Sequence, residues 1–456
     1  MTDNNIRFYA ATLGCKINQY ETQALREVWL ERGFTEVDSA EAADIILVNS
    51  CAVTAKAVSD VRSTVRQANR ANPDALIVVT GCAAQVMAEE LSALPGVARV
   101  VPQEAKASLK RWPDLSGEPV ADEQESALAT EAPDDGDGQR TGAQEDVSFP
   151  DMQVSDYTRA RAVVKVQDGC SHRCTYCIVP LTRGPSRSRA PHDIVAEAER
   201  LLEGGFRELI LSGVNLRQYG RDLAMPLDFW DVVARLGKEL APRWAGKARL
   251  RISSLEPGQL GDKALETLAA NPLLSPQLHL SLQSGSPTVL KRMGRGHYKP
   301  QPLLGFLQQL RDIWPVYGLG ADILMGFPGE TEQEFEETLA FCKELPLTYA
   351  HVFPYSRRPG TAAADMKDQL SVAVKKARAA AIRAVAAEKK EAFLQSLLTH
   401  DTVHVVLQSS SPAKGVSEFY TDCRFDSQPE NATLREIVGA RPVSVRKGTL
   451  IVTPCS

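Results

Sequence analysis

Apolar runs alternate with helical stretches over residues 1–105 and predict a small α/β domain. The expected strands are short apolar runs that end near Gly, Ser or Cys, at 6–13, 45–48 and 76–80. Helical periodicity fills the stretches between them, at 19–32 and 54–71. Strands that alternate with helices favour a parallel sheet with right-handed crossovers.

The same alternation resumes further along and predicts a larger α/β domain over residues 156–398. Its strand candidates are 162–166, 208–212, 248–253, 277–282, 319–325 and 349–353. Its helix candidates are 191–203, 226–238, 259–270, 300–313 and 331–344. Six βα units in about 200 residues favour an open, incomplete parallel (β/α)6 barrel. A long helix rich in Ala, Lys and Arg follows it at 371–398.

The last segment, residues 399–456, changes to the alternation typical of strands. Short strands are expected at 403–407 and 442–445, separated by turns. A small β module of this size binds RNA in some proteins and only packs against its neighbours in others. The pattern leaves both interpretations open.

An acidic linker, residues 106–155, separates the two α/β domains. Residues 114–151 carry a local charge of −11, which leaves +6 on the rest of a chain whose net charge is −5. Low hydrophobicity and the run PDDGDG at 133–138 predict disorder at least at its centre. The mildly basic remainder permits a nucleic-acid partner, although solubility explains it equally well.

Composition indicates a soluble protein of two to four domains, since 43% of the 456 residues are hydrophobic and 24% are charged. Neither an apolar run long enough to span a membrane nor a signal peptide is visible. We therefore expect a cytoplasmic protein. Thiols stay reduced there, so clustered cysteines indicate metal binding or catalysis more often than disulfides.

Three cysteines of the first domain follow its three predicted strands. Cys15, Cys51 and Cys82 each lie one to three residues beyond a strand end. The carboxyl ends of parallel strands share one edge of the sheet, where ligands bind in such folds. The cysteines can therefore converge on a metal site, and three ordinary buried thiols are the alternative.

Three more cysteines, Cys170, Cys174 and Cys177, occupy one short loop at C-x3-C-x2-C spacing. Iron–sulfur clusters are held by Cys thiolates, normally four. Three thiolates therefore indicate a [4Fe–4S] cluster with one iron open to a small molecule. A zinc knuckle and a disulfide loop are the alternatives, but His172 inside the loop is badly placed to complete a zinc site. The loop follows the first barrel strand and so lies at the mouth, where parallel barrels carry active sites.

This loop, with Tyr176 before its last cysteine, resembles the radical S-adenosylmethionine signature. Nearly the whole chain outside the linker resembles the radical S-adenosylmethionine methylthiotransferases. The matching segments are 12–22, 48–54, 79–85, 166–170, 178–184, 212–215, 282–286 and 322–331. The resemblance implies two [4Fe–4S] clusters, with Cys15, Cys51 and Cys82 holding the auxiliary one. It also implies S-adenosylmethionine as cofactor, bound at the open iron of the loop cluster and cleaved to a 5′-deoxyadenosyl radical.

Within this family, TLGCKxNxYE at 12–21 is most similar to the branch acting on N6-threonylcarbamoyladenosine at position 37 of tRNA. Lys16 and Tyr20 carry that assignment. The implied reaction inserts sulfur and a methyl group at C2 of the adenine. Isopentenyl-adenosine in tRNA and a ribosomal-protein aspartate are alternative substrates. A non-catalytic iron–sulfur protein that binds RNA is an alternative of another class.

The resemblance also implies partners and a role for the C-terminal segment. That segment resembles the RNA-binding TRAM domain through residues 415–420, although it is short and has no clear basic cluster. The expected partners are tRNA and a flavodoxin- or ferredoxin-like electron donor, and we expect a monomer. The clusters are expected to face each other across the bound nucleotide, with the first domain capping the barrel mouth.

Further residues are expected around the cofactor and the substrate, while no side chain is expected to act as a catalytic acid or base. Those expected near the cofactor or substrate are Tyr176, Ser212, Gly213, Asn215, Glu256 and Gln283. Loop capping is the alternative for Glu256 and Gln283. Arginines that follow the cysteine loop are expected to clamp tRNA phosphates, with a solvated charge run as the alternative: Arg183, Arg187 and Arg189.

Overall fold

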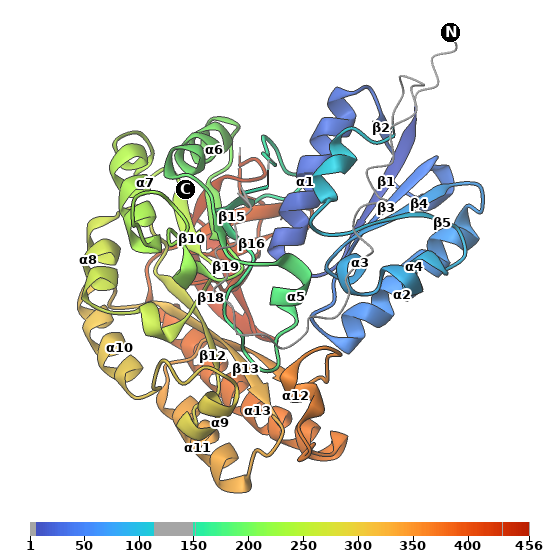
Figure 1. Ribbon diagram of the computed structural model, residues 1–456. Coiled ribbons are helices and arrows are strands. Elements are labelled where there is room, and N and C mark those ends of the chain that lie inside the picture. The colour runs from blue at the N-terminus through green and yellow to red at the C-terminus, as the bar shows by residue number, and fades with distance from the viewer. Residues whose placement is uncertain (1–5, 114–148, 151, 431, 456) are drawn as a thin grey trace.

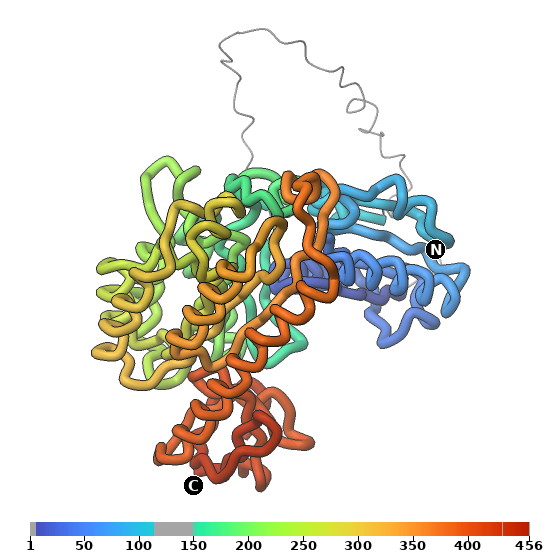
Figure 2. Tube along the Cα trace, turned by 90° about the horizontal axis from the view of Figure 1, so that it is seen from below, coloured from blue at the N-terminus to red at the C-terminus, as the bar shows by residue number. Residues whose placement is uncertain are grey.

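The computed structural model of the protein describes residues 6–113, 149–150, 152–430 and 432–455. It confirms the α/β fold class expected from the alternation of strands and helices. An N-terminal α/β domain lies beside a larger α/β barrel, and a small β barrel follows at the end of a long helix (Figures 1 and 2). The acidic run at 133–138, where we expected disorder, lies outside the described residues.

Five parallel strands form the sheet of the N-terminal domain, in the order β2-β1-β3-β4-β5. They are β1 (Arg7–Thr12), β2 (Thr35–Glu36), β3 (Ile45–Ser50), β4 (Leu76–Gly81) and β5 (Val97–Val101). The central β3 is buried along its whole length, as its apolar run predicts. The edge strands β2 and β5 were not expected, because β2 has only two residues and β5 is partly exposed.

Helices cover both faces of this sheet. They are α1 (Lys16–Glu31), α2 (Ala55–Ala71), α3 (Cys82–Val86) and α4 (Ala88–Ser92). Helix α1 packs on the face that carries Leu47, and α2 packs on the face that carries Ile46 and Val48, because successive strand residues point to opposite faces. The core under α1 continues into the core of the barrel, so the two domains pack as neighbours.

The barrel contains the six predicted strands, all parallel, with the third one interrupted at Ser253. They are β6 (Ala162–Lys165), β9 (Glu208–Ser212), β10 (Arg249–Ile252), β11 (Ser254–Leu255), β12 (Gln277–Gln283), β13 (Gly318–Met325) and β14 (Tyr349–Pro354). Within the described residues β6 and β14 are edge strands that do not pair with each other. The predicted open, incomplete barrel is therefore confirmed.

Helices surround the barrel. They are α6 (Pro191–Glu203), α7 (Phe229–Trp244), α8 (Asp262–Ala270), α9 (Pro287–Arg292), α10 (Pro302–Ile313), α11 (Glu332–Glu344), α12 (Ala362–Asp365) and α13 (Val372–Ser396). All but the two short ones, α9 and α12, match predicted helices. Capping boxes fix the first turns of α7 and α11, formed by Asp228 with Asp231 and by Thr331 with Glu334. The cysteine loop and α5 (Val179–Arg183) lie between β7 (Gln167–Asp168) and β8 (Arg187–Ser188), which pair antiparallel.

The C-terminal segment folds as a closed barrel of five strands, in the order β15-β16-β17-β19-β18. They are β15 (Val403–Ser410), β16 (Ala413–Ser417), β17 (Asp422–Phe425), β18 (Ile437–Arg446) and β19 (Thr449–Pro454). Arg249, the first residue of β10, donates to the carbonyl of His404 at 2.7 Å, and Arg251 donates to that of Ser417 at 3.0 Å. The module therefore sits at the amino-terminal end of the barrel strands, opposite the mouth.

The N-terminal domain lies against the side of the barrel (Figure 1). Helix α1 packs along β6, and Arg358, which follows β14, donates to the carbonyl of Ala52 at 3.4 Å. The expectation that this domain caps the mouth is wrong, because it covers the open side between β6 and β14. A 3-10 turn, Lys106–Lys110, lies past the boundary expected at 105, and its Lys106 is buried. No helix in the described part of the chain is long and apolar enough to cross a membrane.

Candidate active site

Two adjoining cavities lie where the N-terminal domain meets the barrel. The loop cavity, of about 470 Å³, contains the cysteine loop, and the interdomain cavity, of about 700 Å³, lies between α1 and the barrel strands. Both are lined by Cys15, Gly213 and Asp322, so they adjoin. The residues that sequence analysis assigned to two separate cysteine sets thus border one continuous region.

The cysteine loop is held in place by backbone hydrogen bonds from several elements. Cys170 N donates to the carbonyl of Gly184 at 3.0 Å, and Thr175 N donates to that of Met293 at 3.0 Å. Gly169 has a φ of 67°, and a Cβ there would lie 1.9 Å from the carbonyl oxygen of Pro185. The tight path of the loop requires glycine at this position. Cys170, Cys174 and Cys177 all line the loop cavity as a result.

The N-terminal cysteines converge although up to 67 positions separate them. Cys15 precedes α1, Cys51 follows β3, Cys82 begins α3, and all three line the interdomain cavity. Gly14 has a φ of 98°, and a Cβ there would lie 2.7 Å from Cβ of Cys51. This close approach brings the first two loops together. Their convergence at the strand ends agrees with the placement expected from the βα pattern.

Both cysteine sets fit the donor set of a [4Fe–4S] cluster. Each presents three free thiols to one cavity, and all nine cysteines of the chain are free, which disagrees with a disulfide loop. Burial raises the pKa of Cys51 to about 11 and that of Cys177 to about 12. These thiols are therefore protonated near neutral pH, and a metal that binds them must displace their protons.

The carboxylate of Glu256, beside the cysteine loop, contacts two histidines and an arginine. Its carboxylate oxygens lie 3.5 Å from Nδ1 of His172, 3.0 Å from Nε2 of His297 and 3.3 Å from Nη2 of Arg295. Burial opposes its ionisation, but hydrogen bonds from the histidines and the charge of Arg295 hold the pKa of Glu256 below its usual range. His172 thus belongs to a polar cluster beside the cysteine loop, together with Glu256 and His297.

The structure brings most of the expected cofactor- or substrate-binding residues into the loop cavity. Those that line it are Tyr176, Gly213, Asn215, Glu256 and Gln283, whereas Ser212 lines the interdomain cavity. Nδ2 of Asn215 lies 3.5 Å from Sγ of Cys170 and 3.4 Å from Glu256 Oε1. At Gly213 a Cβ would lie 2.8 Å from the side chain of Leu216, so this turn is closely packed. Cofactor or substrate binding by these residues stays a prediction.

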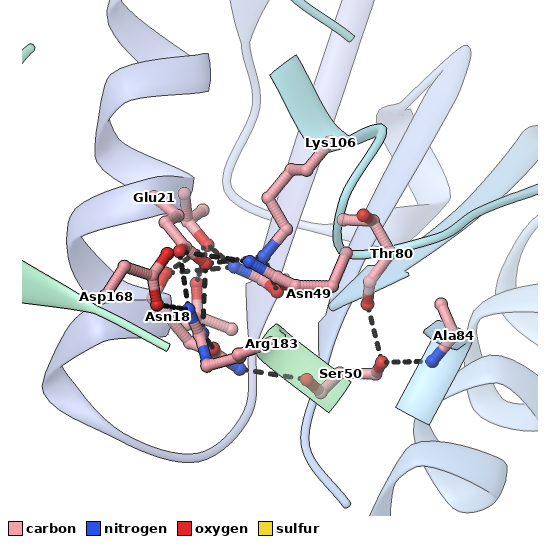
Figure 3. A network of polar contacts seen from close by, with 12 residues as sticks. Asn18, Glu21, Asn49, Ser50, Thr80, Ala84, Lys106, Asp168 and Arg183 are labelled. Atoms are coloured by element: carbon pink, nitrogen blue, oxygen red, sulfur yellow. Dashed lines mark hydrogen bonds and ion pairs between the residues drawn. The ribbon is translucent and has the colours of Figure 1, made fainter. Parts of the chain in front are cut away.

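Arg183 was expected to contact tRNA, but it forms ion pairs that link the barrel to the N-terminal domain. From α5 it donates to Glu21 Oε1 of α1 at 2.8 Å and to Asp168 Oδ1 at 2.9 Å, and Lys106 pairs with the same Glu21 (Figure 3). Lys165 also belongs to this buried network. The side chain of Arg183 is 2% exposed, too little to reach a phosphate on the surface. Paired carboxylates offset the cost of burying such a charge.

The other two arginines of that run are also engaged within the protein. Arg189 is buried and pairs with Glu197 at 3.0 Å, and the Tyr20 hydroxyl donates to the same carboxylate at 2.9 Å. Arg187 is half-buried and donates to the carbonyl of Arg183 at 3.2 Å. The expected phosphate clamp is thus not formed, because the run turns inward toward acidic partners that are distant in sequence.

A polar cluster in the interdomain cavity was missed by sequence analysis. His279 of β12 lies 3.1 Å from Asp322 of β13, which lies 3.2 Å from His351 of β14. Burial opposes ionisation of Asp322, but hydrogen bonds from both histidines hold its pKa below the usual range. The strand QLHLSLQ at 277–283 alternates polar and apolar residues, and this alternation could have indicated polar positions facing the barrel interior.

The sequence matches two known families. The family described as "Uncharacterized protein family UPF0004" matches residues 7–102, and the radical SAM superfamily matches residues 164–342. Among solved structures, the radical S-adenosylmethionine methyltransferase TsrM from Kitasatospora setae superposes with a TM-score of 0.54 at 16% identity, covering 78% of this chain and 75% of that chain. This likeness concerns the fold. Fold, cysteine loop and family match together define a radical S-adenosylmethionine enzyme.

Curated relatives narrow this class. A protein of Bacillus subtilis named threonylcarbamoyladenosine tRNA methylthiotransferase MtaB is 38% identical over 80% of this chain and 77% of its own length. A Clostridium botulinum protein named tRNA-2-methylthio-N(6)-dimethylallyladenosine synthase is 32% identical over 85% of this chain and 83% of its own length. The chain belongs to the radical S-adenosylmethionine methylthiotransferase family, whose members carry a second [4Fe–4S] cluster.

Proposed function

We propose that the protein inserts a methylthio group at C2 of N6-threonylcarbamoyladenosine at position 37 of tRNA. The observation that carries this proposal is the meeting of two cysteine triads at one pair of adjoining cavities. The similarity to relatives named for this substrate supports it. The C2–H bond is neither acidic nor nucleophilic, so acid–base side chains alone do not activate it. Activation of this bond is therefore the part of the reaction that the cofactors supply.

The chain's own residues bind and orient the reactants. Cys170, Cys174 and Cys177 would hold one cluster, and Cys15, Cys51 and Cys82 the other. When bound, the clusters and S-adenosylmethionine supply radical C–H activation and the sulfur and methyl groups that are inserted. Polar groups that line the loop cavity, chiefly Asn215, Glu256 and Arg295, are available to orient S-adenosylmethionine beside the cysteine loop. The N-terminal domain shields the open side of the barrel from water.

The proposal implies partners and a division of labour among the domains. Residues 1–105 would carry the auxiliary cluster, residues 156–398 the radical chemistry, and residues 399–456 RNA binding. The partners would be tRNA and a flavodoxin- or ferredoxin-like electron donor, encountered by a cytoplasmic monomer. Because the C-terminal barrel contacts the strands of the catalytic barrel directly, RNA bound there is held at a fixed position relative to the cavities.

A second candidate substrate is tRNA that carries dimethylallyl (isopentenyl) adenosine. The relative from Clostridium botulinum, which is named for that product, supports it at 32% identity. The apolar dimethylallyl group on N6 of this nucleotide differs from the threonylcarbamoyl group in charge as well as shape. The two candidates therefore make different demands on the cavity walls.

Mass spectrometry of nucleosides from total tRNA tests the proposal, with the gene expressed in a host that lacks both methylthiotransferases. Appearance of 2-methylthio-N6-threonylcarbamoyladenosine is expected. Appearance of the 2-methylthio dimethylallyl nucleoside alone would favour the second candidate. Absence of both, with S-adenosylmethionine cleavage intact, would indicate a protein substrate and overturn the proposal.

A further inference from the structure

Among the described residues that line the interdomain cavity, one cation has no hydrogen-bond or ion-pair partner. The charged side chains that line this cavity are Lys16, Arg183, Arg251 and Asp322. Arg251 donates to both carboxylate oxygens of Glu208, at 2.9 and 3.0 Å. Arg183 and Asp322 are paired as described above. Within the described residues the Lys16 ammonium makes no hydrogen bond and no ion pair, which sets it apart from the other three.

The surroundings of Lys16 are mostly positive and aromatic. Among the described residues that line the cavity, the one carboxylate is Asp322, which is already paired with His279 and His351. The guanidinium groups of Arg161 and Arg251 lie over the ring of Tyr420, at 5.5 and 5.1 Å from its centroid. Tyr420 belongs to the C-terminal barrel, has a φ of 64°, and lines the cavity together with Lys16. A cation held among other cations in a half-buried place favours an anionic ligand, because removing charge from water is costly unless the charge is paired.

We propose that Lys16 binds the carboxylate of the threonylcarbamoyl group and thereby selects this substrate over nucleotides with uncharged N6 substituents. The inference rests on the proposed function and specifies its substrate site. In N6-threonylcarbamoyladenosine the amino group of threonine is part of the carbamoyl linkage, so its carboxylate stays free and negative. The dimethylallyl group offers no such charge.

The positions of Lys16 and the auxiliary cysteines suit this assignment. Lys16 follows Cys15 directly in the chain and begins α1, so both side chains reach the cavity from one place. In adenine, C2 and the carbon that bears N6 flank the same ring nitrogen. A base that presents C2 toward the cysteines therefore directs its N6 substituent along the same cavity. Tyr349, Tyr420 and His279 supply aromatic faces and hydrogen-bonding groups around it.

The test compares two anticodon stem-loop RNAs that differ in one group. One carries N6-threonylcarbamoyladenosine, and the other carries its carboxamide, which is neutral and nearly the same size. Binding and kcat/KM are measured for wild type, Lys16→Met and Lys16→Arg, all with clusters reconstituted. Lys238→Met, on the exposed side of α7, is the matched control. Iron content is checked in each, because Lys16 adjoins Cys15.

Wild type is expected to prefer the acid RNA by about 10- to 100-fold, the range for a hydrogen bond to a charged group. Lys16→Met should abolish this preference by weakening the acid RNA alone, and Lys16→Arg should retain most of it. The readout is the ratio of the values for the two RNAs. A loss of clusters or of folding lowers both values equally and leaves this ratio unchanged.

Equal losses on both RNAs in Lys16→Met would overturn the proposal and place Lys16 against a backbone phosphate or in a structural role. No loss on either RNA would overturn it as well. If wild type modified a dimethylallyl-adenosine RNA and neither of these two, the proposed function itself would fail, and this assignment with it. The outcomes therefore separate an error in the site from an error in the reaction.

Discussion

Arg183 in the barrel donates to Glu21 in the N-terminal domain at 2.8 Å across a sequence separation of 162 residues. The two carboxylate oxygens of Glu21 also accept from Lys106 and Lys165, so one buried anion joins three cations. Because α1 carries both Glu21 and the residues that follow Cys15, this contact fixes the auxiliary cysteines relative to the barrel. The network therefore positions the two cysteine sets relative to each other.

Substitution Glu21→Gln should therefore destabilise the protein strongly. It keeps the shape of the side chain but leaves Lys165 and Arg183 with Asp168 as their acidic partner. Lys106 keeps only the amide oxygen of Asn49 among its partners in the described residues, and such a loss costs about 3–5 kcal/mol. The urea midpoint of the whole chain should fall accordingly. Glu239→Gln, which removes an exposed i,i+4 partner of Arg235, should cost about 0.5 kcal/mol or less. Equal shifts for the two variants would contradict the role assigned to Glu21.

The same network should make stability sensitive to acid. Burial opposes ionisation of Asp168, but Lys165 and Arg183 outweigh it and lower the pKa of Asp168 to about 2 from its ordinary value of 3.8. The unfolded chain therefore binds more protons between these two values, and stability falls as the pH falls through that window. Asp168→Asn should melt lower than wild type at pH 5, and the gap should narrow as the pH approaches 3. A gap that stays constant would show that Asp168 is not the group responsible.

How far sequence predicted this structure depends on how local each signal is. The barrel strands and helices followed from apolar runs and from helix starts such as Thr331, because these signals lie within each element. The convergence of Cys15, Cys51 and Cys82 was predictable too, since strand ends of a parallel sheet share one edge. Family resemblance added the identity of the clusters, which spacing alone does not provide.

Long-range pairing was beyond such reasoning. Arg183 and Arg189 read as a basic surface run, yet their partners Glu21 and Glu197 lie on other elements. The position of the N-terminal domain was misjudged for the same reason, because contact between α1 and β6 depends on which edge of the barrel stays open. The cluster of His279, Asp322 and His351 required knowing that three strands are neighbours.

Single cysteine substitutions should separate the two metal sites. Cys174→Ala should abolish S-adenosylmethionine cleavage, whereas Cys51→Ala should retain cleavage and lose methylthiolation. Each should lower bound iron by about half, since each removes a ligand of one of two four-iron clusters. Iron and 5′-deoxyadenosine are measured after anaerobic reconstitution. Cys455→Ala, at an exposed cysteine outside both cavities, should match wild type, and a loss of cleavage in Cys51→Ala would contradict the division of labour.

Gly318 should be essential for the packing of the C-terminal barrel against the catalytic barrel. It begins β13, and a Cβ there would lie 2.1 Å from the carbonyl oxygen of Phe419, so Gly318→Ala must displace the β16–β17 turn. Overpacking of this kind costs about 1–3 kcal/mol. Because Tyr420 follows Phe419 and lines the interdomain cavity, modification of the threonylcarbamoyl RNA should fall together with stability.

The matched control for Gly318→Ala is Gly305→Ala in α10, where no atom outside the adjacent residues and the helix's own backbone lies within 4 Å of the added Cβ. Alanine there should stabilise the helix by roughly 0.5–1 kcal/mol, since glycine loses more backbone freedom on folding. Urea midpoints and limited proteolysis between α13 and the C-terminal barrel report both effects. If Gly318→Ala kept its protease resistance and its activity, the turn at Phe419 would have to be mobile enough to withdraw. Tyr420 would then have no fixed place in the cavity that Lys16 lines together with Arg251 and Tyr349.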